Sequence, residues 1–121
     1  MNAMYPESRM ELEISALDFR RMKDRPAQAG SQPLCLVDVR EPWEAETAAI
    51  PGSSLIPMRE IAARAHPELD KEAHIVVYCH LGQRSLSVVM WLREQGFPRS
   101  QSLAGGIDAW SRTVDPSIPR Y

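Results

Sequence analysis

Cys79 and Arg84 are the residues of this sequence whose types and spacing best suit chemistry, and they lie in the segment Cys79-His-Leu-Gly-Gln-Arg-Ser85. A short loop that leads into a helix directs several unpaired backbone N–H groups into one small space, which favours an anion. A cysteine at the mouth of such a loop is held as a thiolate by those amides, by the positive end of the helix and by Arg84. The pattern therefore predicts that Cys79 is a reactive nucleophile.

The residues on either side of this segment predict a strand before it and a helix after it. Residues 75–78 read Ile-Val-Val-Tyr, a β-branched and aromatic run that is typical of a buried strand. From Ser85 onward an apolar run has helical length, and Gly96 followed by Pro98 indicates where that helix ends. Strand, loop and helix would together hold Cys79 at the end of the strand.

A second strand is predicted over residues 34–39, which are almost wholly apolar, as in a parallel sheet that is buried on both faces. Asp38 and Arg40 close this strand, at the end where parallel sheets place their ligands. Arg40 could instead form a salt bridge with Glu44 or Glu46, and we expect Asp38 to be a structural hydrogen-bond acceptor.

Strands alternate with helices along the rest of the chain, which predicts a parallel sheet with helices on both faces. We expect an edge strand over residues 10–14, a helix capped by Ser15 and a helix over residues 58–65. Residues 1–9 are expected to be a flexible leader, and residues 10–121 are of a length that fits a single domain.

Composition excludes several classes of function. A net charge of −2 and an isoelectric point near 5.9 give no electrostatic footprint for nucleic acid. No apolar stretch approaches a membrane span, and residues 1–13 lack the pattern of a signal peptide, so we expect a cytoplasmic protein. His66 and His74 lack metal-ligand spacing and are expected at the surface, whereas Cys35 is expected to be a small buried hydrophobe.

Four motifs, taken together and in this order, resemble the single-domain rhodaneses, a family of sulfurtransferases. Any one of them is weak evidence, but they come in the order of the family, and the resemblance covers about residues 10–121. The motifs are Leu36-Val-Asp-Val-Arg-Glu-Pro42, Ile50-Pro-Gly52, Cys79-His-Leu-Gly-Gln-Arg-Ser85 and Leu103-Ala-Gly-Gly-Ile-Asp-Ala-Trp110. Ala49 stands where the family usually has a histidine, a position associated with support of the fold.

The resemblance implies a five-stranded sheet and a reaction through a persulfide. Cys79 would attack the outer sulfur of a small anionic donor such as thiosulfate, sulfite would leave, and cyanide, a thiol or a protein would then accept the sulfur from Cys79. No metal or organic cofactor is implied. Arg40 becomes a candidate for binding the substrate anion, and the other candidate binding residues are those of the loop: His80, Leu81, Gly82, Gln83, Arg84 and Ser85.

Two other functions are open to a chain of this kind. Phosphatases and arsenate reductases of similar fold have five residues between the cysteine and the arginine, whereas only four separate Cys79 from Arg84 here, so the ring is too small for a tetrahedral oxyanion. A non-catalytic binding module is the other alternative, although inactive relatives usually lack the cysteine that this chain keeps. His80 matches neither the thiosulfate-preferring nor the mercaptopyruvate-preferring pattern, so thiosulfate is the donor only by default.

Overall fold

The computed structural model of the chain describes residues 10–25 and 33–121, and the predicted leader over residues 1–9 lies outside them. The described residues form a five-stranded sheet in the order β1-β5-β4-β2-β3, in which every neighbouring pair is parallel. The predicted five-stranded parallel sheet is therefore confirmed. The strands are β1 (Glu13–Ile14), β2 (Leu34–Asp38), β3 (Ser54–Leu55), β4 (His74–Tyr78) and β5 (Ser100–Leu103).

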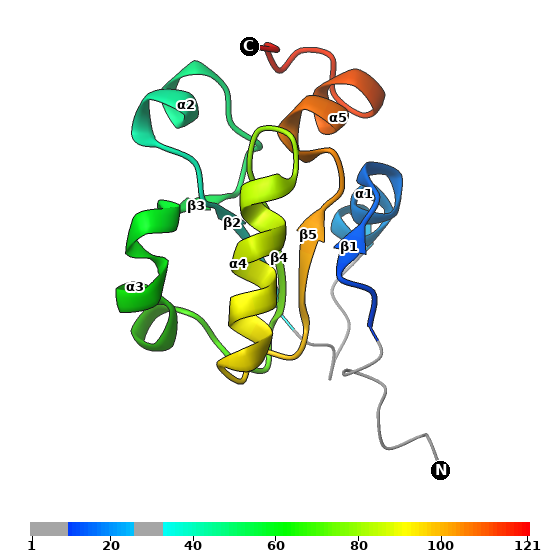
Figure 1. Cartoon of the computed structure of the whole chain (residues 1–121). Helices are drawn as coiled ribbons and strands as arrows, with labels where there is room; N and C mark the ends of the chain where they lie inside the picture. Colours follow the sequence, from blue (N-terminus) through cyan, green and yellow to red (C-terminus); the bar gives the residue numbers. More distant parts are fainter. Residues whose placement is uncertain (1–9, 26–32) are drawn as a thin grey trace.

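Helices cover both faces of this sheet, as predicted (Figure 1). One face packs against α3 and α4, and the other packs against α1 and α5, while α2 lies at the edge where the strands end. No described helix combines the length and the apolar character needed to cross a membrane. The helices are α1 (Ala16–Asp24), α2 (Pro42–Thr47), α3 (Ile61–Glu68), α4 (Gln83–Glu94) and α5 (Gly106–Thr113).

The central strand β4 divides its side chains between two hydrophobic cores. Ile75 and Val77 point into the core beneath α3 and α4, and Cys79 continues that alternation just after the strand. Val76 and Tyr78 point into the core beneath α1 and α5. Cys79 therefore leaves the sheet on the face that α4 covers.

The register of β2 against β4 brings two motif-bearing strand ends together. Asp38 pairs with Tyr78, so the residues that follow them, Arg40 and Cys79, leave the same edge of the sheet. Figure 1 shows α2, the loop after β4, α5 and the last residues of the chain gathered at this edge. This is the edge at which parallel sheets place their ligands.

Two predicted helices differ from the structure at their N-terminal ends. Helix α4 begins at Gln83 rather than Ser85, because Gly82 takes a positive φ of 111° and ends the loop two residues earlier. The predicted helix over residues 58–65 is a 3₁₀ turn (Met58–Glu60) followed by α3, which leaves Met58 partly exposed. The Ser15 hydroxyl accepts a hydrogen bond from the Asp18 amide and caps α1 as predicted.

Candidate active site at the end of the central strand

The loop between β4 and α4 wraps around the sulfur of Cys79. The backbone amides of Gly82 and Ser85 donate to Cys79 Sγ at 3.1 and 3.3 Å, and the Ser85 hydroxyl lies 3.3 Å from it. The amides of Gln83 and Arg84, in the first turn of α4, have no acceptor within the helix and can serve a bound anion. This arrangement favours negative charge on Cys79 Sγ and on a sulfur attached to it.

Cys79 is more enclosed than its sequence position indicates. The sequence places it at the mouth of the loop, but only 1% of the residue is exposed. The same loop that stabilises the thiolate therefore also covers it.

The base of the loop is fixed by the start of α5. The amides of Ile107 and Asp108 donate to the carbonyls of Cys79 and His80 at 2.9 and 3.2 Å. Gly106 makes this approach possible, because a Cβ atom there would lie 2.3 Å from the His80 carbonyl oxygen. Gly106, the first residue of α5, is thus part of the site.

Arg40, a predicted candidate for binding the substrate anion, is enclosed by other residues of the chain in this structure. Its side chain is fully buried and forms a salt bridge of 2.7 Å with Asp38, which accepts three hydrogen bonds from Arg40. The guanidinium also donates to the carbonyls of Glu44 and Ala48 and to the Tyr121 hydroxyl. Burial opposes the charge, but the hydrogen bonds with Asp38 and Tyr121 outweigh it and raise the pKa of Arg40. Arg40 therefore holds β2, α2 and Tyr121 together next to the Cys79 loop.

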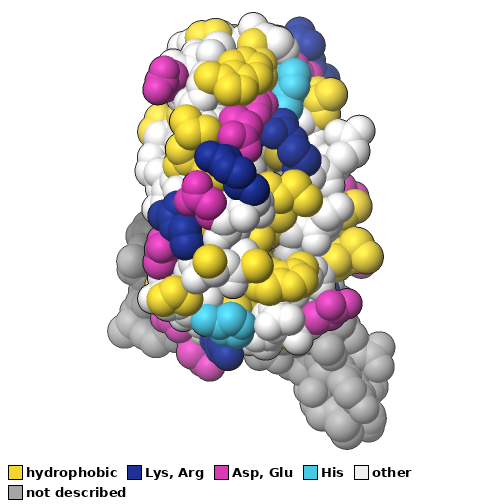
Figure 2. Space-filling view, turned by 60° about the vertical axis from the view of Figure 1, so that its left-hand side comes forward, with side chains coloured by type: hydrophobic (Ala, Val, Ile, Leu, Met, Phe, Trp, Pro, Cys, Tyr) yellow, Lys and Arg dark blue, Asp and Glu magenta, His cyan; other side chains and the backbone are white. Residues whose placement is uncertain are grey.

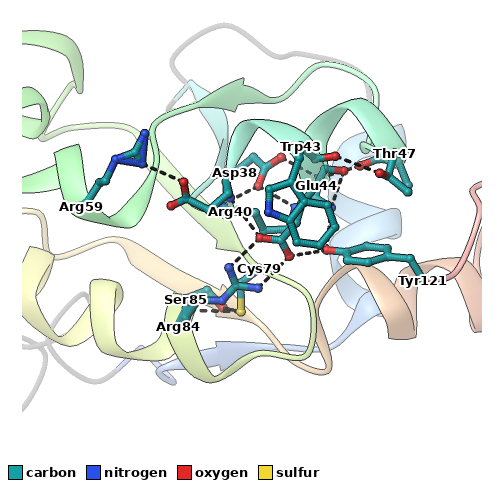
Figure 3. Close-up of polar contacts among 12 residues, drawn as sticks. Asp38, Arg40, Trp43, Glu44, Thr47, Arg59, Cys79, Arg84, Ser85 and Tyr121 are labelled. Atoms are coloured by element: carbon teal, nitrogen blue, oxygen red, sulfur yellow. Dashed lines mark hydrogen bonds and ion pairs between the residues drawn. The ribbon is translucent and has the colours of Figure 1, made fainter.

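Arg84, the predicted partner of a substrate anion, is bound to Glu44. Its two terminal nitrogens donate to the two carboxylate oxygens of Glu44 at 2.8 and 3.0 Å (Figure 3). The Tyr121 hydroxyl donates to the same carboxylate at 2.7 Å, and the Glu41 amide donates to it at 3.0 Å. Hydrogen bonds from Arg84 lower the pKa of Glu44 to about 2 despite the opposing effect of burial. Glu44 is therefore an anion in the resting site.

Tyr121 joins the end of the chain to the loop. Its ring stacks on the His80 ring with centroids 4.0 Å apart and an angle of 13° between the planes, and Trp43 meets it edge-on at 6.0 Å. Its hydroxyl bridges Arg40 and Glu44, and burial raises the pKa of Tyr121 to about 12. Tyr121 thus contacts both the outer side of the loop and the buried ion pairs.

The loop residues predicted to bind substrate divide into two groups. Gly82 and Ser85 contact the sulfur through their amides, whereas Leu81 and Gln83 are exposed on the outer side of the loop. Glu44, Gly106 and Tyr121 also belong to the site but were not predicted as site residues from the sequence. The pair Gly105-Gly106 at the start of α5 was the one local signal, because Glu44 and Tyr121 reach the loop from distant segments.

Charges around the site are interleaved rather than gathered by sign. Figure 2 turns the left-hand side of Figure 1 forward and shows acidic and basic side chains alternating over this face. Salt bridges account for the pattern, among them Arg59 with Glu41 and Arg64 with Glu60. Within residues 10–25 and 33–121, no three His, Cys, Asp or Glu side chains gather as metal ligands would.

Residues 15–113 match the model of the rhodanese-like domain family, and the chain belongs to that family. A protein described as a sulfurtransferase from Allochromatium vinosum is 34% identical over 105 residues, which cover 87% of this chain and 95% of that protein. The fold and the site thus define a rhodanese-like domain of the sulfurtransferase family.

Other relatives are longer than this chain. A rhodanese-like/PpiC domain-containing protein 12 of Arabidopsis thaliana, described as chloroplastic, is 44% identical over 89 residues, which cover 71% of this chain but only 30% of that protein. An adenylyltransferase and sulfurtransferase MOCS3-1 of Zea mays is 33% identical over 96% of this chain and 24% of its own length. The chain therefore spans about a quarter to a third of these two relatives.

Solved structures support the same fold. A rhodanese-related protein from Thermoplasma volcanium superposes with a TM-score of 0.73 at 26% identity, over 92% of this chain and all of that chain. A rhodanese-like domain protein from Staphylococcus aureus gives a TM-score of 0.71 at 25% identity, over 92% of this chain and 99% of that one. The five-stranded rhodanese-like fold is thus shared with chains of similar length.

Proposed function

We propose that this chain transfers a sulfane sulfur from thiosulfate or a similar small anionic donor to a thiophilic acceptor through a persulfide on Cys79. The observation that carries the proposal is the direction of the Gly82 and Ser85 amides, which both donate to Cys79 Sγ. Membership of the rhodanese-like family supports it.

The reaction needs two displacements at sulfur. The Cys79 thiolate attacks the outer sulfur of thiosulfate, the S–S bond of the donor breaks, and sulfite leaves with the bonding electron pair. The charge that then rests on the outer sulfur of the persulfide is stabilised by the loop amides, as an oxyanion hole stabilises developing charge. An acceptor thiolate or cyanide attacks this outer sulfur, and Cys79 leaves as the thiolate.

The acceptor in this proposal is a thiol or a protein. Trp43 and Leu81, on α2 and on the Cys79 loop, are 61% and 51% exposed, and such apolar side chains suit contact with a protein. We place the reaction in the cytoplasm, because it requires Cys79 as a thiol, and both Cys35 and Cys79 are free cysteines.

Mass spectrometry of the intact chain after incubation with thiosulfate tests the proposal. We expect a gain of one sulfur on Cys79 that is lost on addition of cyanide. The matched variants are Cys79→Ser, which should gain none, and Cys35→Ser, which should gain as much as the unaltered chain. No gain with several donors, or hydrolysis of an aryl phosphate that depends on Cys79, would contradict the proposal.

A non-catalytic binding module is the second candidate, because Cys79 is 1% exposed and Arg84 is bound to Glu44. In that function the loop is a rigid surface and the cysteine is a packed side chain. The two functions differ in one measurement. The binding module requires that Cys79 gain no sulfur from any donor while the chain stays folded.

A further inference from the structure

Arg84 is the positively charged side chain of the Cys79 loop, and its charge is balanced by a carboxylate of the same chain. Both of its terminal nitrogens bind the Glu44 carboxylate, and Glu44 is held in place by the Tyr121 hydroxyl and the Glu41 amide. The hydrogen bonds with Glu44 raise the pKa of Arg84. A substrate anion that approaches Arg84 is therefore repelled by the Glu44 carboxylate, which already occupies both terminal nitrogens of Arg84.

The second guanidinium near the loop is also neutralised. Arg40 is fully buried and its charge is matched by Asp38, so it offers nothing to a ligand. In Figure 3, Arg40 is thus paired with Asp38 and Arg84 with Glu44, and Arg59, farther from Cys79, is paired with Glu41. The groups that the structure directs at the sulfur itself are the loop amides of Gly82 and Ser85, which carry partial rather than full positive charges.

We infer that Glu44 is a specificity-determining residue, which cancels the charge of Arg84 and turns the site from dianionic donors such as thiosulfate toward alkyl hydropersulfides. This inference rests on the proposed function and narrows its donor class. A hydropersulfide carries at most one negative charge on its two sulfurs. It therefore faces less repulsion from Glu44 than thiosulfate, which carries two charges.

The transfer from such a donor balances without an oxidant. The Cys79 thiolate attacks the outer sulfur of the hydropersulfide RSSH, the S–S bond of the donor breaks, and the thiolate RS⁻ leaves with the bonding pair. Cys79 becomes a hydropersulfide that keeps the proton of the outer sulfur. The transferred sulfur keeps its oxidation state, because one thiol replaces another as its partner. The loop amides then stabilise the new hydropersulfide on Cys79, as in the reaction with thiosulfate.

The substitution Glu44→Gln tests the inference, and Glu46→Gln is the matched control. Glu46 is exposed on the same helix α2, so its substitution removes the same charge two residues from Glu44. We measure kcat/KM with thiosulfate and with 2-hydroxyethyl hydropersulfide for each protein. For Glu44→Gln we expect the ratio of thiosulfate to hydropersulfide to rise about fivefold or more, and for Glu46→Gln to stay within about twofold. An unchanged ratio in Glu44→Gln, or an equal rise in both variants, overturns the inference.

A measurement on the unaltered chain keeps the test valid if Glu44→Gln does not fold. The rates of Cys79 alkylation by iodoacetate and by neutral iodoacetamide are compared with those of a free cysteine derivative. We expect their ratio to lie within about threefold of the free thiol's, because Glu44 offsets Arg84. A preference for iodoacetate of about tenfold or more overturns the inference. This assay needs no sulfur transfer, so it separates failure of the inference from failure of the proposed function.

Discussion

The hydroxyl of Ser102 lies 2.7 Å from the hydroxyl of Ser85, which in turn lies 3.3 Å from Cys79 Sγ. Both serines are fully buried, and Ser85 has a second acceptor in the Gly82 carbonyl at 3.3 Å. A hydroxyl carries one proton, so Ser85 can donate to a Cys79 thiolate only when it gives up the Gly82 carbonyl. Ser102 then donates to the Ser85 oxygen. Ser102, on β5, thus supports the charged form of Cys79 through Ser85.

The substitution Ser102→Ala should make the Cys79 thiolate harder to form. We expect Cys79 to be alkylated about three- to tenfold more slowly at a fixed pH, which corresponds to the loss of one hydrogen bond. Ser100→Ala is the control, because Ser100 is buried in the same strand but its hydroxyl donates to the Phe97 carbonyl. Equal rates of Cys79 alkylation in the two variants would show that Ser102 plays no such part.

Arg40 should contribute to folding rather than to substrate binding. The substitution Arg40→Met leaves Asp38 buried without its partner, and we expect the free energy of unfolding to fall by about 3 to 5 kcal/mol. Arg59→Met removes an exposed salt bridge with Glu41 and should cost about 0 to 1 kcal/mol. Urea unfolding of the two variants compares them. Equal midpoints would contradict the structural role of Arg40.

Acid should weaken the fold partly through Glu44. Hydrogen bonds from Arg84 lower the pKa of Glu44 from 4.5 to about 2, so this carboxylate stabilises the fold above pH 4.5 and loses that effect as the pH falls toward 2. We expect the free energy of unfolding to drop by roughly 3 kcal/mol more between about pH 5 and pH 2 in the unaltered chain than in Glu44→Gln. Parallel pH profiles from urea unfolding would refute this account of Glu44.

Gly106 should tolerate no side chain. A Cβ atom there would meet the carbonyl oxygens of His80 and Cys79 at 2.3 and 2.5 Å, so Gly106→Ala must displace the base of the loop. We expect a loss of about 3 kcal/mol or more in the free energy of unfolding, together with loss of persulfide formation. Gly52→Ala is the control, since its φ is also positive but no heavy atom lies within 4 Å, and it should cost about 1 to 2 kcal/mol. Similar losses would show that the contact with the loop is not what requires glycine.

The parts of the site that the sequence predicted are those formed by neighbouring residues. The apolar run before Cys79, the loop and the helix after it are local patterns, and the alternation along β4 follows from strand geometry. The cap of α1 by Ser15 is local in the same sense. The alternation of strands and helices predicted the parallel sheet, and the resemblance of the four motifs implied its five strands; the structure confirms both.

The parts that the sequence did not predict depend on contacts between distant segments. Arg40 was expected to face a substrate or to pair with Glu44 or Glu46, but Tyr121 and the Ala48 carbonyl complete a buried shell around it, with Asp38 as its ion-pair partner. Arg84 meets Glu44 across 40 positions of sequence. Periodicity and motifs cannot predict these partners, because the contacts depend on how α2 and the last residues of the chain pack against the loop.

The central claim is that the amides of the loop stabilise a sulfur anion at Cys79, and the transfer of sulfur to Cys79 tests this most directly. The folded Cys35→Ser variant is incubated with thiosulfate and, separately, with 2-hydroxyethyl hydropersulfide, and the mass of the intact chain is followed. We predict a gain of one sulfur on Cys79 that is lost on addition of cyanide. No gain from either donor in a chain that stays folded would contradict the claim.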